Sequence, residues 1–238
     1  MRRWKLAIVA AFIAASTVGS AYALSVNVTF TKLTGVTGGS PAATAVYRAD
    51  LSGLGLSQVQ SISIVDNSGG VGGSPGQFSG FDLDAIILSN SMVGDAGSAA
   101  ALVGLAGFDY SPSGTYFTAG TQRPIVDPAL FGSLGGNVNN AVATLGSFDG
   151  NSTTAIPGAH GFISMGDGGI LGFDLTSVIA TAGLYLYIGE VGDNGEVAAG
   201  RISVSDQPIV PLPAAVWAGM VVLSGVGGVR TMRRRRAV

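Results

Sequence analysis

Cysteine is absent from the 238-residue chain, and charged residues make up only 11% of it. Without cysteine the chain can form no disulfide, no thiol nucleophile and no thiolate metal site. One histidine, His160, cannot supply the several ligands that a histidine-based zinc site needs. Its position in the sequence also does not indicate a serine and a carboxylate that would complete a catalytic triad. We therefore expect no enzymatic activity and place His160 in a surface loop.

Basic residues are scarce between the two ends of the chain. Eight of the twelve lysines and arginines lie near the termini, which leaves four to balance all 14 acidic residues: Lys32, Arg48, Arg123 and Arg201. Such an acidic body argues against nucleic acid as a partner, because phosphates need a basic surface. Glycine, by contrast, is abundant at 38 residues and spread along the chain, which is typical of turns between short strands.

Residues 1–23 have the three parts of a secretory signal peptide. Basic residues at positions 2, 3 and 5 precede the apolar run Leu6–Ala15, which is short for a membrane span. Ala21 and Ala23 then form an A-x-A site for signal peptidase. The sequence predicts export with cleavage before Leu24; the alternative is an uncleaved membrane anchor.

Residues 208–238 combine three features in a fixed order. Three prolines make the segment from Pro208 to Ala214 extended and resistant to helix. The apolar run Ala215–Val229 follows, about 22 Å long as a helix. A cluster of arginines closes the chain: Arg230, Arg233, Arg234, Arg235 and Arg236. By the positive-inside rule the arginines stay cytoplasmic and the body lies outside.

This tail resembles the PEP-CTERM class of sorting signals in its VPLPA-type variant. The resemblance is carried by the proline motif, the apolar run and the arginine cluster, the motif being Val210, Pro211, Leu212, Pro213 and Ala214. It implies recognition by an exosortase in the inner membrane of a Gram-negative bacterium that makes exopolysaccharide. The tail then holds the protein in the membrane until cleavage delivers the body to the cell surface or extracellular matrix. Eukaryotic lipid-anchor tails, the rival assignment, lack terminal arginines.

Residues 24–207 contain no composition break, so we expect one all-β domain, an antiparallel β-sandwich of jelly-roll type. Asn194 and Gly195 predict a hairpin turn, whereas 98–106 and 176–182 predict short helices. Short β-branched and apolar runs predict the strands: 24–30, 45–51, 58–65, 81–88, 116–118, 141–145, 161–165, 170–175, 184–188 and 201–204. Four Phe-Asp pairs recur, at 81, 108, 148 and 173, where we expect phenylalanine in the core and aspartate at a turn.

Candidate binding residues in this domain are few. Asp82 and Asp84 share a strand face, but a glycosidase would also need a pocket that raises one pKa. We expect no cofactor; the alternative is a bound calcium ion. Its oxygen ligands would come from Asp167, Glu190, Asp193 and Glu196. Tyr185 and Tyr187 also share a strand face and could stack on sugar rings or pack the sheet interior.

The sequence therefore predicts a surface or matrix protein with a structural or adhesive role. Its expected partners are signal peptidase, an exosortase, the membrane through the C-terminal helix, and exopolysaccharide. A carbohydrate-binding module, calcium-dependent or not, is the first alternative, and a secreted hydrolase is the second.

Overall fold

The computed structural model describes residues 24–39, 42–70, 72, 74–150, 161–194 and 201–209. Within these ranges the protein is an all-β structure with antiparallel sheets and few helices. No helix in the described ranges is long and apolar enough to cross a membrane. The predicted signal peptide with Ala21 and Ala23, the sorting motif at 210–214 and the arginine cluster lie outside the described residues.

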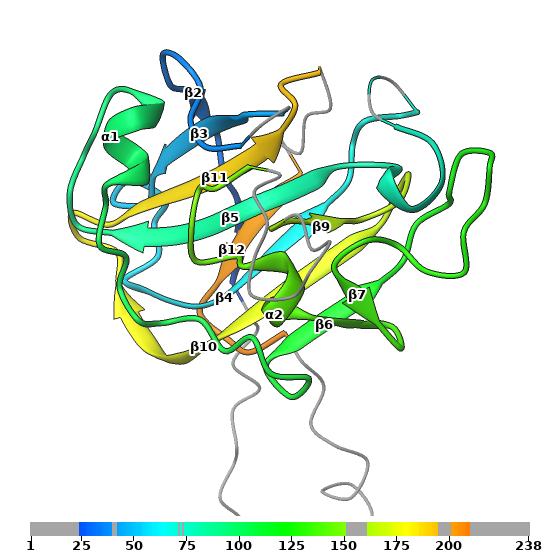
Figure 1. Ribbon diagram of the computed structural model, residues 1–238. Helices are drawn as coiled ribbons and strands as arrows, with labels where there is room; N and C mark the ends of the chain where they lie inside the picture. Colours follow the sequence, from blue (N-terminus) through cyan, green and yellow to red (C-terminus); the bar gives the residue numbers. More distant parts are fainter. Residues whose placement is uncertain are drawn as a thin grey trace, which may run out of the picture.

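Two five-stranded antiparallel sheets form the body, and Figure 1 shows them as two layers. Sheet one has the order β1 (Ser25–Asn27), β12 (Ile202–Ser205), β4 (Gln58–Val65), β10 (Ile170–Ala180) and β6 (Thr115–Thr118). Sheet two has the order β2 (Thr31–Lys32), β3 (Thr44–Asp50), β11 (Tyr185–Val191), β5 (Asp82–Ser89) and β9 (Ile163–Ser164).

The facing sides of the two sheets share one hydrophobic core. Ile62 and Ile64 of β4, two positions apart and therefore on one strand face, are fully buried. They belong to the same cluster as Leu83 of β5 and Ile188 of β11 in the other sheet. The run 58–65, predicted as a strand, thus turns its alternate apolar residues toward sheet two.

The outer side of sheet two carries a second, smaller core. Val46, Ile87 and Tyr187 point away from sheet one and pack under α1 (Ala96–Ala100) and Phe148. The helix begins at Asp95, whose side chain accepts a hydrogen bond from the Ser98 amide at 2.8 Å. Sheet two is therefore buried on both sides over much of its width.

Several local predictions were wrong where pairing outweighs local propensity. The expected helix at 176–182 is the end of β10, where Ile179 pairs with Val59 after a bulge. The expected strand at 141–145 is α2 (Asn140–Ala143), which ends at Thr144 in a left-handed conformation. The helix expected at 98–106 is α1, which starts earlier and stops at Ala100.

The predicted hairpin at Asn194 and Gly195 is also wrong, because β11 and β12 belong to different sheets. A hairpin that the sequence did not single out joins β7 (Ser133–Leu134) to β8 (Asn137–Val138). Its turn consists of Gly135 and Gly136, both at positive φ, and η1 (Gly76–Phe78) is the remaining short element.

Candidate functional site

The two ends of the described body lie side by side. β1 pairs antiparallel with β12, with Ser25 opposite Ser205, and both strands run together in Figure 1. The amide of Leu24 also donates a hydrogen bond to Oδ1 of Asp206 at 3.2 Å. The chain therefore enters and leaves the body at one edge of sheet one.

Past β12 the chain crosses sheet one and is fixed to it. The hydroxyl of Ser61 on β4 donates to the carbonyl oxygen of Gln207 at 2.5 Å. The amide of Ile209 donates to Oδ1 of Asp174 on β10 at 2.7 Å. Gly172 leaves room for this crossing, since a Cβ there would lie 3.2 Å from the Ile209 side chain. The predicted sorting motif starts at the very next residue.

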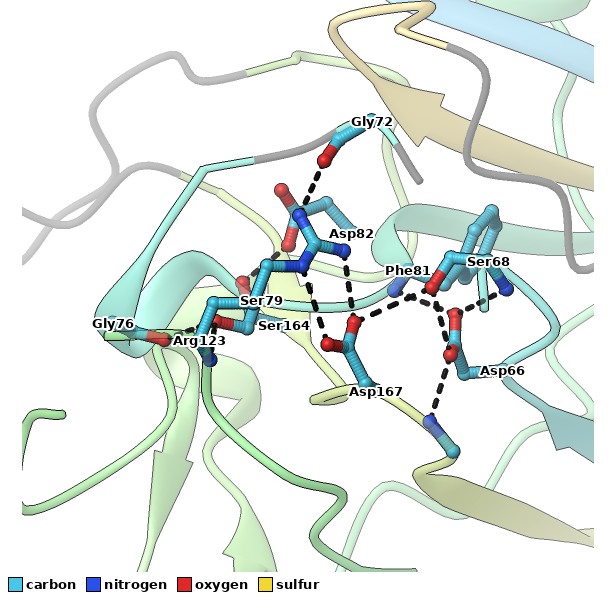
Figure 2. Close-up of polar contacts among 11 residues, drawn as sticks. Asp66, Ser68, Gly72, Gly76, Ser79, Phe81, Asp82, Arg123, Ser164 and Asp167 are labelled. Atoms are coloured by element: carbon cyan, nitrogen blue, oxygen red, sulfur yellow. Dashed lines mark hydrogen bonds and ion pairs between the residues drawn. The ribbon is translucent and has the colours of Figure 1, made fainter. Parts of the chain in front are cut away.

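A polar network ties together the loops at one end of the sheets, and Figure 2 shows it with Asp66 on the right. Asp66 follows β4 and is 1% exposed. Its carboxylate accepts hydrogen bonds from the Gly168 amide at 2.8 Å, the Phe81 amide at 3.0 Å and the Ser68 hydroxyl at 2.9 Å. These donors come from three separate loops, so Asp66 fixes the loops to one another.

Arg123 extends the network from the segment between β6 and β7. Its Nη2 and Nε donate to the two oxygens of Asp167 at 2.8 and 3.2 Å (Figure 2). Its Nη1 donates to the carbonyl of Gly72, and its backbone amide to the hydroxyl of Ser79 at 2.9 Å. Asp167, one of the candidate calcium ligands, is thus placed against a guanidinium.

The other candidate calcium ligands lie apart from Asp167. Glu190 is buried on β11 and accepts a hydrogen bond from the hydroxyl of Tyr47 at 2.9 Å. Asp193 pairs with the ammonium group of Lys32 at 2.5 Å on the surface. Glu196 lies outside the described residues, and no three His, Asp or Glu side chains converge as a metal cluster within the described part.

A pair of carboxyl groups that the sequence did not bring together lies where the loop 146–150 meets β5. Asp84 of β5 is 0% exposed, and its Oδ2 accepts a hydrogen bond from the Thr44 hydroxyl at 2.5 Å. Its Oδ1 is buried and has no hydrogen-bond partner among the described residues. The carboxyl of Asp149, half-buried, lies within hydrogen-bonding reach of Asp84 and contacts the Thr144 hydroxyl at 3.2 Å.

Both carboxyl groups are harder to ionise than usual. Burial is the main cause that raises the pKa of Asp84 to about 8. The Thr44 hydroxyl and the backbone amide of Gly150 oppose this rise, and the charge of Asp149 adds to it. Burial also raises the pKa of Asp149, against the Thr144 hydroxyl. Two carboxylates this close can coexist only by sharing a proton or a cation.

Glycines allow the covering loop to approach the sheet. A Cβ on Gly189 of β11 would lie 2.7 Å from the Thr44 side chain and 2.9 Å from the Phe148 ring. A Cβ on Gly38, which has a positive φ, would lie 2.6 Å from the backbone of Asp149. Neither contact is visible in the local sequence, because each joins segments more than 40 residues apart.

The remaining predicted residues do not form a site. Asp82 accepts a hydrogen bond from the Ser164 hydroxyl, a different partner from that of Asp84. Tyr187 is 0% exposed and its hydroxyl donates to the Ser91 carbonyl at 2.8 Å, so its ring packs the interior beside the half-buried Tyr185. His160 lies outside the described residues.

The Phe-Asp pairs follow the expected division only for phenylalanine. Phe81, Phe148 and Phe173 are buried, and Phe108 packs against the core. Asp109 closes a turn by accepting from the Ser111 amide at 2.9 Å, and Asp149 accepts from Thr144, five residues earlier. Asp82 and Asp174, by contrast, bond to distant segments. The recurring pair is therefore a packing pattern rather than a shared site.

A shallow hollow of about 340 Å³ lies beside β5, and Tyr110 is the only titratable residue in its lining. Apolar side chains and glycine backbone form most of this lining: Ile86, Ile87, Gly104, Leu105, Ala106, Gly107, Phe108, Tyr110 and Gly146. It contains none of the carboxylates described above.

Comparisons of the chain with family models, with curated proteins and with solved structures found no match.

Proposed function

We propose that the chain is an exported, non-enzymatic protein of a bacterial cell surface or exopolysaccharide matrix, with a structural or adhesive role. Its signal peptide directs it across the inner membrane, and its tail holds it there until an exosortase removes the tail. The observation that carries this proposal is the meeting of the two ends of the body at β1 and β12.

A body with adjacent ends suits tethering from one side. The predicted signal peptide ends just before Leu24, and the predicted sorting motif starts just after Ile209. Between these points the chain is tied to itself by the pairing of Ser25 with Ser205 and by the contact of Leu24 with Asp206. Removal of both ends would therefore leave every strand of the two sheets in place.

We also propose that the body is a β-sandwich of jelly-roll type. Its main strands in chain order are β1, β3, β4, β5, β9, β10, β11 and β12. The first, eighth, third and sixth of these are neighbours in sheet one, and the second, seventh, fourth and fifth are neighbours in sheet two. This order matches a jelly roll, with β6 and β2 as added edge strands.

The polar interior supports a structural role rather than catalysis. The carboxylates of Asp66 and Asp167 are engaged by amides, hydroxyls and a guanidinium that hold loops together. The hollow beside β5 offers a substrate no carboxylate, histidine or basic group. A rigid acidic body of this kind is suited to a hydrated glycan matrix, where charge keeps proteins soluble.

The test is mass spectrometry of the protein from medium and surface fractions, in cells with and without their exosortase. We expect a body that starts at Leu24 and ends between Pro211 and Ala214, and that disappears when the exosortase is deleted. An added mass at the new C-terminus would identify what the body is attached to.

A pair of variants sharpens this test. Replacing Pro211 and Pro213 by alanine should block processing, whereas Pro208→Ala, just outside the motif, should not. An intact chain ending at Val238 in both strains would refute the sorting proposal and leave the tail as a plain anchor.

A further inference from the structure

Within the described part of the chain, no lysine or arginine forms an ion pair with Asp84 or Asp149. Asp84 is fully buried and Asp149 half-buried. Lys32 is paired with Asp193, and Arg123 with Asp167. Arg48 donates to the Val93 carbonyl at 2.5 Å, and Arg201 is exposed ahead of β12. The four lysines and arginines of the body thus lie elsewhere, and none of them is among the causes that shift the pKa of Asp84 or Asp149.

The pair also has an unused ligand atom. Asp84 Oδ1 is buried without a hydrogen-bond partner among the described residues, while its Oδ2 holds the Thr44 hydroxyl. A buried carboxylate oxygen without a partner is costly, since such groups are almost always satisfied. The Asp84 carboxyl also interacts with the backbone amide of Gly150 and with the carboxyl group of Asp149, which brings a second acid to the same point.

The surroundings are rich in oxygen. The hydroxyls of Thr44 and Thr144 contact the two carboxyl groups, at 2.5 Å from Asp84 and 3.2 Å from Asp149. Close approach at Gly38 and Gly150 adds the carbonyl oxygens of Phe148 and Ala42 to the same region. Hard cations such as calcium take six to eight oxygen ligands from carboxylates, carbonyls, hydroxyls and water.

We propose that Asp84 and Asp149 bind a divalent cation, with calcium the best match, between β5 and the loop 146–150. The ion would take Oδ1 of Asp84 and the carboxylate of Asp149, and water would complete its shell on the half-exposed side of Asp149. It neutralises both charges, which a single shared proton cannot do. This site is distinct from the sequence candidates Asp167, Glu190, Asp193 and Glu196, and it does not rest on the proposed sorting.

With two carboxylates the affinity falls in the weak range of extracellular calcium modules, a Kd on the order of 0.1–1 mM. The test is calorimetric titration of calcium chloride into the full chain in detergent, with thermal unfolding followed in parallel. We expect saturable binding, and at tenfold excess over the Kd a rise in Tm of about 3–5 °C that EGTA reverses.

Matched variants locate the ion. Asp84→Asn and the half-exposed Asp149→Asn, which is the safer of the two to fold, should each weaken calcium binding at least tenfold. Asp193→Asn, which removes the carboxylate paired with Lys32, should bind as the wild type does. No heat and no Tm shift for the wild type, or an equal response from Asp149→Asn, would overturn the proposal. If the wild type shows no heat and no Tm shift, greater stability of Asp84→Asn than of the wild type at pH 8 would indicate that the two carboxyl groups share a proton and bind no cation.

Discussion

The hydroxyl of Tyr47 on β3 lies 2.9 Å from Oε2 of Glu190 on β11, inside the core that both sheets share. Burial, followed by the charge of Glu190, raises the pKa of Tyr47 far above its usual range, so the phenol stays a donor at any physiological pH. A buried carboxylate on a core face is tolerated because this donor faces it.

Tyr47→Phe should destabilise the body by about 1–3 kcal/mol, because it deprives a buried Glu190 oxygen of its donor. Urea unfolding measures the loss. Tyr116→Phe is the matched control: Tyr116 is exposed and its hydroxyl contacts only Thr118 among the described residues, so the change should stay within about 0.5 kcal/mol. Equal losses would mean that the buried contact contributes nothing specific.

Arg123→Lys should lower the free energy of unfolding by about 1–2 kcal/mol, because lysine cannot reproduce the bidentate hydrogen bonds to Asp167 and the further bonds of the guanidinium. Lys32→Met removes the more exposed ion pair with Asp193 and should cost under about 1 kcal/mol. Thermal unfolding at 0.05 and 0.5 M salt compares the two. A larger loss for Lys32→Met would contradict the structural role of the loop network.

Gly80→Ala tests the close packing of the loops around that network. Gly80 has a φ of +77°, and a Cβ there would lie 2.3 Å from the backbone of Gly166. Gly55 has the same φ but open space around it. We expect about 1 kcal/mol of destabilisation for Gly55→Ala from backbone strain alone, and about 3 kcal/mol or more for Gly80→Ala. Indistinguishable values would show that these loops do not pack as described.

In EGTA the raised pKa of Asp84 makes stability depend on pH. The folded-state pKa, about 8, lies above the unfolded value near 3.8, so the folded protein holds its proton more tightly. The stabilising contribution is complete below about pH 4 and is lost as the pH rises toward 8, on the order of a few kcal/mol at most. Asp84→Asn should flatten this slope. A wild-type curve flat from pH 5 to 8 would refute the prediction.

The pairing of the chain ends can be tested directly, since the chain contains no cysteine. Ser25 and Ser205 are opposite one another in the antiparallel pair of β1 and β12, where Cα atoms lie about 4.5–5.5 Å apart. Cysteines at both positions should therefore oxidise to a disulfide and raise the Tm. Cysteines at Asn27 and Ser205 are out of register and should stay largely reduced. Gel mobility without reductant distinguishes the two.

Strand positions followed well from periodicity in the sequence. The run 58–65 coincides with β4, and 45–51 and 184–188 differ from β3 and β11 by a few residues at their ends. Local pattern failed where a distant partner decides: Val59 keeps Ile179 in a strand that small residues had marked as helix. Strand order could not be derived locally, and the hairpin expected at Asn194 shows why.

The carboxyl pair was half visible. Asp84 stood out beside Asp82 on one strand face, but its true partner, Asp149, lies 65 residues further along in a loop without regular structure. The contact depends on Gly38 and Gly189 allowing two loops to lie down on sheet two. No periodicity marks such a meeting, because it arises from backbone approach rather than from side-chain alternation.

The pairing of the first strand with the last also determines when the body can fold. Sheet one needs β12 between β1 and β4, so until residues 202–205 are present β1 has no partner strand in the sheet and β4 has only β10. Native contacts this far apart in sequence slow folding, since a long loop must close before they form. In the export proposed above, where the N-terminus crosses the membrane first, this delay would leave β1 unpaired, and so able to be threaded, until the end of the body has crossed.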